Sequence, residues 1–335
     1  SQMKKTLIAM AAVAVAGVAS AQVTITGAMA VGFASKSFAN LADGTTVPSV
    51  AGFGSNGSSI TFSASEDLGG GLSVAASVGI DDAEYGVGVT GNGSSLTLAG
   101  PFGSVMMAMG EETCDGLSQL GGGARLDGAG FGCGANSADF LKYTFPELAP
   151  GLKLAVGKGD YATVDGLASA EAANGLGGDV ASTTWYADYS SGPFAVGFNV
   201  TNYDELYGTG NYENKRRVHG SFDLGVAKIS AGVQSGGVAL SAKSDRTVLG
   251  LSVPMGALTA GIGYGSIKTT AAGASTSTTR ATTGLNLAYA LSKRTSLVGD
   301  FNRTSGTGNV STASSATANN GKERAYNRVL VKHSF

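Results

Sequence analysis

Apolar and polar residues alternate with a period of two along most of the chain. In the last ten residues, Val329, Val331 and Phe335 share one face with His333, whereas the other face is occupied by Arg328, Leu330 and Lys332. A period of two is that of a β-strand and not of a helix. We expect this last strand to pair with the first one and close a barrel, because closure leaves no unpaired edge.

The same alternation predicts sixteen strands, an even number. They lie within residues 23–33, 59–65, 72–80, 96–98, 105–109, 141–145, 152–156, 185–189, 194–200, 217–222, 229–233, 247–253, 258–264, 283–289, 297–301 and 326–335. The segments 36–57 and 110–138 show no such alternation and are predicted to be long loops. The sequence therefore predicts an all-β protein built from antiparallel strands.

The connections between these strands alternate between short turns and loops of ten residues or more. This arrangement is typical of a bacterial outer-membrane barrel, with short periplasmic turns and long extracellular loops. Aromatic residues adjoin the short turns, where the girdle of such a barrel is expected: Phe102, Phe145, Tyr189, Phe194, Tyr289 and Phe335. A secreted β-sandwich or solenoid, the soluble alternative, does not require that placement.

The N-terminal segment has the organisation of a secretory signal peptide. Lys4 and Lys5 precede an apolar run over residues 7–18, and Ala19-Ser20-Ala21 follows it. We expect cleavage after residue 21 and a single domain over residues 22–335, with an uncleaved anchor as the alternative.

Composition narrows the possible functions. Only 14% of the residues are charged, and no clustered basic face indicates binding of nucleic acid. The chain has two histidines and two cysteines and no Cys–His cluster, so we expect neither a metal site nor a cofactor. Because an exported pair of cysteines usually forms a disulfide, we expect Cys114 and Cys133 to be bridged, with two free thiols as the alternative.

Four segments closely resemble the general porins of Gram-negative proteobacteria, especially the betaproteobacterial type. They are Ser65-Glu-Asp-Leu-Gly-Gly-Gly-Leu72, Leu98-Ala-Gly-Pro-Phe-Gly-Ser-Val105, Tyr289-Ala-Leu-Ser-Lys-Arg-Thr295 and Val331-Lys-His-Ser-Phe335. The resemblance implies a sixteen-stranded barrel in the outer membrane, normally a homotrimer in contact with lipid and lipopolysaccharide. It also implies passive diffusion of small hydrophilic solutes and ions, without enzymatic activity, through a pore that the third long loop narrows.

The chain departs from that family pattern at three positions. Ser63, Asn92 and Met109 stand where such porins commonly carry an arginine. The departures put an inherited preference for anions in doubt.

Charged residues in the third loop and on the predicted strands are the candidate site. The loop carries Glu111, Glu112, Asp115, Arg125 and Asp127, and the predicted pore wall carries Lys142, Lys153, Asp188, Arg217, Lys228, Arg246, Asp300 and Arg328. Since charged rings set the selectivity of a narrow pore, we expect an electric field between the acidic loop and the basic wall. Alternatively, each of these charges is simply solvated in a wide, wet lumen. His219 is expected to face the lumen as a neutral group.

Two other functions remain open. One is a substrate-specific channel with the same fold, and the other is a structural or adhesive surface barrel with little transport. Saturable conductance for one solute would favour the first, and zero conductance would favour the second.

Overall fold

The computed structural model describes residues 22–38, 47–81, 90–111, 120–124, 126, 137–160, 181–203, 214–236, 242–271, 277–306 and 323–335. Every named element in them is a strand: β1 (Gln22–Phe38), β2 (Val50–Ser55), β3 (Ser59–Gly69), β4 (Leu72–Asp81), β5 (Thr90–Gly100), β6 (Gly103–Glu111), β7 (Ser137–Thr144), β8 (Leu152–Asp160), β9 (Ala181–Ser191), β10 (Phe194–Tyr203), β11 (Lys215–Asp223), β12 (Lys228–Ser235), β13 (Ala242–Met255), β14 (Leu258–Ala271), β15 (Ser277–Ala290), β16 (Thr295–Gly306) and β17 (Glu323–Ser334). None of the described residues lies in a helix long and apolar enough to cross a membrane.

From β3 to β17 each strand pairs antiparallel with the next, and β1 joins the two ends. One edge of β1 pairs with β17, and its other edge pairs with both β3 and β2. The pairs Ala28–Ser59 and Val31–Ser55 differ by one residue in register, so β2 and β3 are two parts of one barrel strand interrupted by a bulge. The fold is therefore a closed antiparallel barrel of sixteen strands, as predicted.

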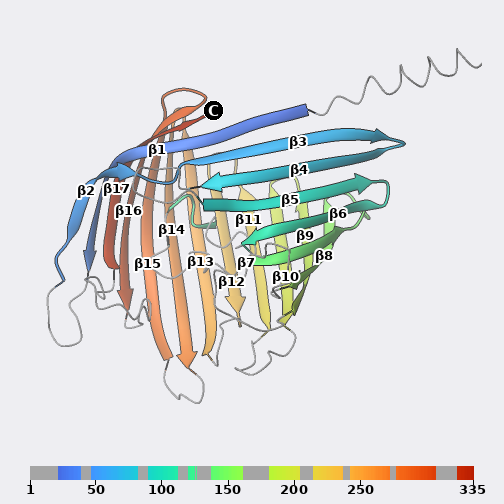
Figure 1. The fold of residues 1–335 in the computed structure, drawn as a ribbon. Helices are drawn as coiled ribbons and strands as arrows, with labels where there is room; N and C mark the ends of the chain where they lie inside the picture. The colour runs from blue at the N-terminus through green and yellow to red at the C-terminus, as the bar shows by residue number, and fades with distance from the viewer. Residues whose placement is uncertain are drawn as a thin grey trace, which may run out of the picture.

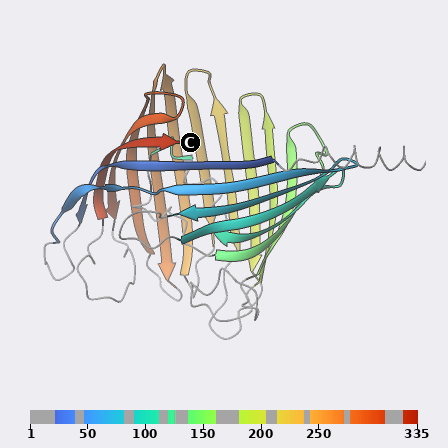
Figure 2. The ribbon, with the colours of Figure 1, turned by 45° about the horizontal axis from the view of Figure 1, so that its top comes forward.

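The last residue takes part in the closure. The Phe335 N–H donates to the Gly27 carbonyl at 2.9 Å, and the Gly27 N–H donates to the Phe335 carbonyl at 2.9 Å. In Figure 2 the C-terminal strand runs beside β1, which brings the two ends of the described chain together. This confirms the prediction that the final strand pairs with the first.

The prediction of a loop over residues 36–57 is wrong at both ends. β1 extends to Phe38, and residues Val50–Ser55 form β2. Gly52 and Gly54 interrupt the apolar alternation of β2, which is held in place by pairing with β1 and not by its own pattern.

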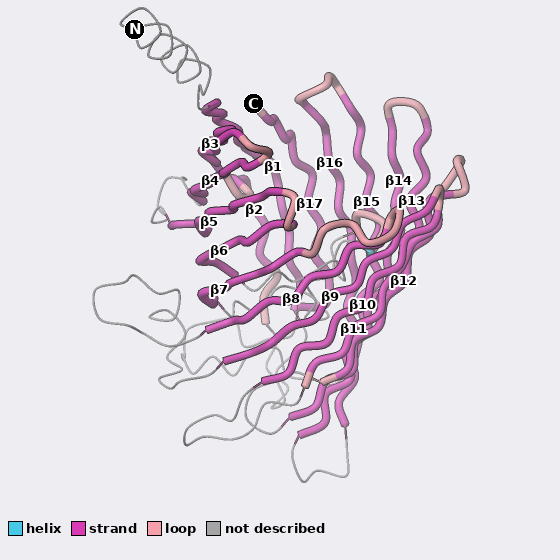
Figure 3. The backbone as a smooth tube through the Cα atoms, turned by 90° about the vertical axis from the view of Figure 1, so that its right-hand side faces the viewer, coloured by secondary structure: helices cyan, strands magenta, loops and turns pink. Residues whose placement is uncertain are grey.

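The strands on two opposite sides of the barrel run in different directions. In Figure 1, β1 and β3–β7 run across the view, whereas β11–β15 on the far wall run nearly perpendicular to them. A barrel of tilted strands produces this crossing. The short turns that join β15 to β16 and β13 to β14 lie along one rim (Figure 3).

The two faces of the sheet have the reverse of the polarity found in a soluble protein. Large apolar side chains are exposed on the outside, among them Met107 at 62% and Ile262 at 54%. Polar side chains such as Thr282 and Asn302 are buried inside, at 0% and 3% exposure. An apolar exterior around a polar interior is the arrangement of a barrel that faces lipid.

The predicted aromatic positions lie beside the short turns of the barrel. Phe102, Tyr189, Phe194, Tyr289 and Phe335 are each 39–49% exposed, and Phe145 is half-buried. Tyr143 packs edge-on against Phe145 with ring centroids 4.8 Å apart, and its hydroxyl donates to the Phe102 carbonyl at 2.6 Å. Amphipathic rings at this level are suited to a membrane interface.

Candidate functional site

The charged residues predicted to line the pore alternate with outward apolar residues. Leu141 and Val218 are 47% and 45% exposed on the outer face, so their neighbours Lys142 and Arg217 project inward. The same alternation places the other predicted wall residues on the inner face: Lys153, Asp188, Lys228, Arg246, Asp300 and Arg328. Their role in selecting solutes stays a prediction.

Three inward arginines follow one another around the wall. Arg217 on β11 is in register with Gln234 on β12, which is in register with Arg246 on β13. Ile267 on β14 then leads to Arg280 on β15. Arg217 donates to Gln234 Oε1 through Nε at 3.0 Å and through Nη2 at 2.7 Å. Gln234 thus lies between two guanidinium groups and fixes one of them.

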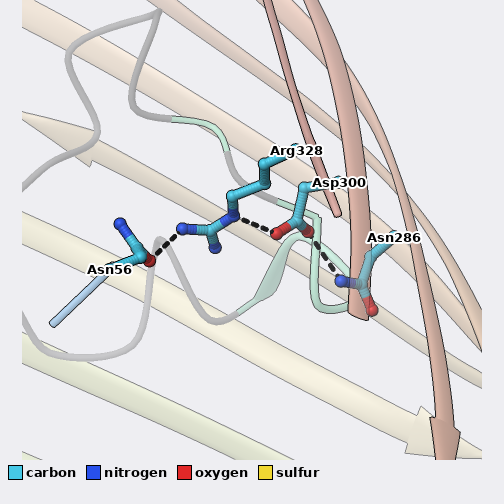
Figure 4. Close-up of polar contacts among 4 residues, drawn as sticks. All are labelled: Asn56, Asn286, Asp300 and Arg328. Carbon is cyan, nitrogen blue, oxygen red and sulfur yellow. Dashed lines mark hydrogen bonds and ion pairs between the residues drawn. The ribbon is translucent and has the colours of Figure 1, made fainter. Parts of the chain in front are cut away.

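A second polar network crosses the seam where the barrel closes. Arg328 Nε on β17 donates to Asp300 Oδ2 on β16 at 2.6 Å, and Asn286 Nδ2 on β15 donates to Asp300 Oδ1 at 2.6 Å. On the other side of β1, Arg328 Nη1 donates to Asn56 Oδ1, between β2 and β3 (Figure 4). The Asp300 side chain is 3% exposed, and these contacts satisfy both of its oxygens.

Part of the third long loop lies inside the barrel. The inner segment, which we define as residues 120–124 and 126, lies against the inner faces of β12–β15. A Cβ added to Gly250 would overlap the Leu120 carbonyl, and one added to Gly261 would overlap the Gly122 carbonyl. Ser230 Oγ donates to the Leu120 carbonyl at 2.5 Å. Glycines in the wall therefore let the backbone of the inner segment contact the strands directly.

An apolar pair completes this contact. Val248 lies on the inner face of β13 between the outward Thr247 and the outward, exposed Leu249, yet it is 0% exposed. Leu126, 1% exposed, packs on Val248 together with the partly buried Leu120. Burial of such a side chain stabilises a fold by roughly 1.5–3 kcal/mol. A valine that faces the lumen is thus explained by the leucines that cover it.

The wall formed by β3–β6 is lined differently. The middle of its inner face on β3–β5 carries small, uncharged side chains, and Ser63, Ser77 and Ser95 follow one another in register across β3, β4 and β5. The inward Asp67 and Asp81 lie near the ends of β3 and β4. Ser77 and Ser95 are joined by a hydroxyl hydrogen bond of 2.8 Å. Ser63, one of the departures from the family pattern, therefore lies at the lumen in a row of hydroxyl groups.

The other two departures from the family pattern, Met109 and Asn92, are not among the described residues that face the lumen. Met109 shares the outward face of β6 with Met107 and Val105, so it does not occupy the pore wall that the sequence comparison implied. The side chain of Asn92 lies outside the described residues.

Most of the predicted loop residues lie outside the described residues: Glu112, Cys114, Asp115, Arg125, Asp127 and Cys133. Glu111 is the last residue of β6, and its side chain is not described. The predicted loop charges and the predicted disulfide therefore stay predictions.

Four residues of these networks were not predicted. Arg280 and Asn286 lie on the inner face of β15, and strict alternation from Leu285, carried three residues before the predicted strand start, would have found both. Gln234 follows the alternation of β12 in the same way. No sequence signal marks Asn56, because its contact with Arg328 depends on the bulge between β2 and β3.

His219 also faces the lumen, as predicted. Its Nε2 lies 4.0 Å from Asp188 Oδ1, across β10. Gly197 lies between them, and a Cβ at this position would overlap the imidazole and the carboxylate. Because Gly197 has no side chain, the imidazole of His219 and the carboxylate of Asp188 can approach each other.

Comparison with known sequences gives one family match. A sequence model described as Gram-negative porin matches residues 7–309. No protein with a curated functional description matches the chain in sequence.

Solved porin structures share the fold over nearly the whole chain. The anion-selective porin from Comamonas acidovorans is 20% identical, with a TM-score of 0.70 over 94% of this chain and 100% of that one. The trimer form of OmpT from Vibrio cholerae is 14% identical, with a TM-score of 0.69 over 94% and 100% of the two chains. OmpF from Salmonella typhi in complex with daunomycin is 13% identical, with a TM-score of 0.67 over 93% and 97%.

Proposed function

The chain belongs to the Gram-negative porin family, and we propose that its third loop narrows the pore to a throat in which charged side chains select the solutes. The protein is an outer-membrane diffusion channel for small hydrophilic solutes and not an enzyme. The observation that carries the proposal is the inner segment, because a loop that contacts the inner wall of a barrel reduces the open cross-section.

The inner segment and the basic residues of the wall lie close together. The segment lies on the same wall as the arginine row, one pleat closer to the short-turn rim than Arg246. Glu111 ends β6, which is far from β11–β15 in the strand order, so we expect the field between the loop acids and these bases to cross the lumen. A solute passing the throat would meet both signs of charge, with bases in excess among the wall residues named above.

Exchange of Glu111 and Glu112 for glutamine tests this throat. We expect the ratio of anion to cation permeability to rise about severalfold, because two negative charges are removed from a narrow passage. The measurement is the reversal potential of single channels in asymmetric salt. Glu66→Gln is the matched control, because Glu66 shares the outward face of β3 with Phe62. A reversal potential unchanged in the double variant would remove both residues from the throat, and zero conductance of the parent would favour a structural surface barrel.

We also propose that the protein is a homotrimer that contacts lipid and lipopolysaccharide through its apolar outer face. One of the similar structures, OmpT from Vibrio cholerae, is described as a trimer. The molar mass of the detergent-solubilised protein, measured by light scattering with the detergent subtracted, tests this assembly. A mass of one chain, about 33 kDa before any processing, would contradict it.

A further inference from the structure

A cavity of about 550 Å³ lies between the inner segment and the barrel wall. Leu120, Gly122 and Gly123 line one side, and inward residues of β8–β15 line the other. This volume is within the range of small-molecule sites. The cavity is part of the lumen, so a solute that crosses the pore can reach it.

The charged side chains of the cavity carry a positive excess. Lys153 and Lys228 are exposed to its interior, against the single carboxylate of Asp188, whose side chain is 55% exposed. Asp188 is in register with Lys153 on one side and lies 4.0 Å from His219 Nε2 on the other. Lys153 thus offsets the Asp188 carboxylate. Lys228 is in register with Asp223, whose Oδ1 accepts from the Gly225 N–H at 2.8 Å, and the exposed Lys228 ammonium can bind an incoming anion.

Uncharged polar groups surround the same space. The hydroxyls of Ser221, Ser252 and Thr259 and the carboxamide of Asn286 line the cavity. The Asn286 Nδ2 is engaged by Asp300, which leaves its carbonyl oxygen as an acceptor. Hydroxyls that donate and accept are suited to the hydroxyl groups of a sugar-like solute.

From these groups we infer that the cavity is a binding site for small hydroxylated carboxylates, of the size of a sugar acid, on the permeation path. The carboxylate binds Lys228, and the hydroxyls of the solute bind Ser252 and Thr259, which follow on β13 and β14, and Asn286 on β15. Lys153, four strands away on β8, adds to the positive field of the cavity. A neutral sugar lacks the charged contact, and chloride lacks the hydroxyl contacts. This inference rests on the proposed diffusion channel and adds a solute class to it.

The experiment compares gluconate with glucose, which differ in the carboxylate and are similar in size and hydroxyl content. The chain is reconstituted in planar bilayers in potassium chloride, and the ion current is recorded as either solute is added. We expect gluconate to reduce the current in a saturable manner and glucose to reduce it only as far as viscosity requires. Equal titrations for the two solutes would overturn the binding site while leaving the channel intact.

Three variants test which charged residues act on the solute in the cavity. Lys153→Gln combined with Lys228→Gln should weaken the gluconate effect about tenfold or more, because the charge-assisted contact with Lys228 and the positive field of Lys153 are both lost. Asp188→Asn should strengthen it severalfold, a change of opposite sign that misfolding would not produce. Lys293→Gln, in the exposed turn between β15 and β16, removes the same charge outside the cavity and should leave the titration unchanged. A double lysine variant with the parent's affinity would overturn the site, and a parent without any conductance would overturn the channel itself.

Discussion

The two walls of the lumen differ in what they present to water. The middle of the inner face of β3–β5 is a surface of small, uncharged side chains joined by contacts such as that of Ser77 with Ser95. The inner face of β11–β17 carries buried charges, two polar networks and the inner segment. A barrel strand needs only backbone pairing and an apolar outer face to be stable in a membrane, so the side chains of the inner face are available for function. The wall of β11–β17 uses them to hold the inner segment and to carry charge, whereas the middle of the wall of β3–β5 carries short polar side chains.

The largest expected effect on stability comes from the polar network of Arg328, Asp300 and Asn286 at the seam where the barrel closes. Arg328→Ala leaves the Asp300 carboxylate, which is 2% exposed as a residue, without its cation. Removal of one partner of a buried ion pair costs about 3–5 kcal/mol in the free energy of unfolding. The check is a urea titration of the barrel in detergent, followed by the tryptophan fluorescence of Trp185.

Two further variants make this test specific. Arg303→Ala removes an arginine from the outward face of the neighbouring strand β16 and should change the free energy of unfolding by less than about 0.5 kcal/mol. Asp300→Asn added to Arg328→Ala should recover part of the loss, because the buried carboxylate is then gone. If Arg303→Ala and Arg328→Ala lowered stability equally, the network would not be the cause.

A smaller effect is expected where the inner segment contacts the wall. Gly261→Ala places a methyl group where the Gly122 carbonyl lies, and overpacking of this kind costs about 1–3 kcal/mol. We expect single-channel conductance to change from one level to a broad or noisy distribution, because the inner segment loses its fixed position. Gly52→Ala on β2 is the control, since a Cβ there meets nothing within 4 Å. One sharp level at the parent's conductance would show that the segment does not depend on this contact.

The sequence predicts the barrel and much of the charged wall, because alternation alone decides which side chains face the lumen. It predicts Arg217, Arg246 and Asp300 on the inner face for that reason. It does not predict where the inner segment lies, since the contact is made by backbone against glycines such as Gly250 and Gly261, which no apolar pattern marks. The family pattern implied a wall position for Met109, but Met109 shares the outward face of β6 with Met107.

The variant with the smallest expected effect on stability tests the difference between the two walls most directly. Ser63→Arg puts a base at one end of the serine row, on the wall of β3–β6, where the inner charges Asp67 and Asp81 lie near the ends of their strands. Two unit charges 4 Å apart in water interact by about 1 kcal/mol, so we expect a severalfold shift of the permeability ratio toward anions in dilute salt. Since the side chain enters a lumen lined by small residues, we expect little change in the free energy of unfolding.

The salt dependence of that shift distinguishes a charge effect from a steric one. The Debye length falls from about 30 Å at 0.01 M salt to about 3 Å at 1 M, so an effect of charge on the permeability ratio should largely disappear at high salt. Ser63→Gln, similar in bulk but uncharged, should leave the reversal potential unchanged and lower the conductance slightly at every salt concentration. If both variants moved the reversal potential equally, the width of the passage and not its charge would decide which ions cross. The wall of β3–β6 would then matter for the space it leaves open, and the charges of the opposite wall would serve chiefly to hold the inner segment.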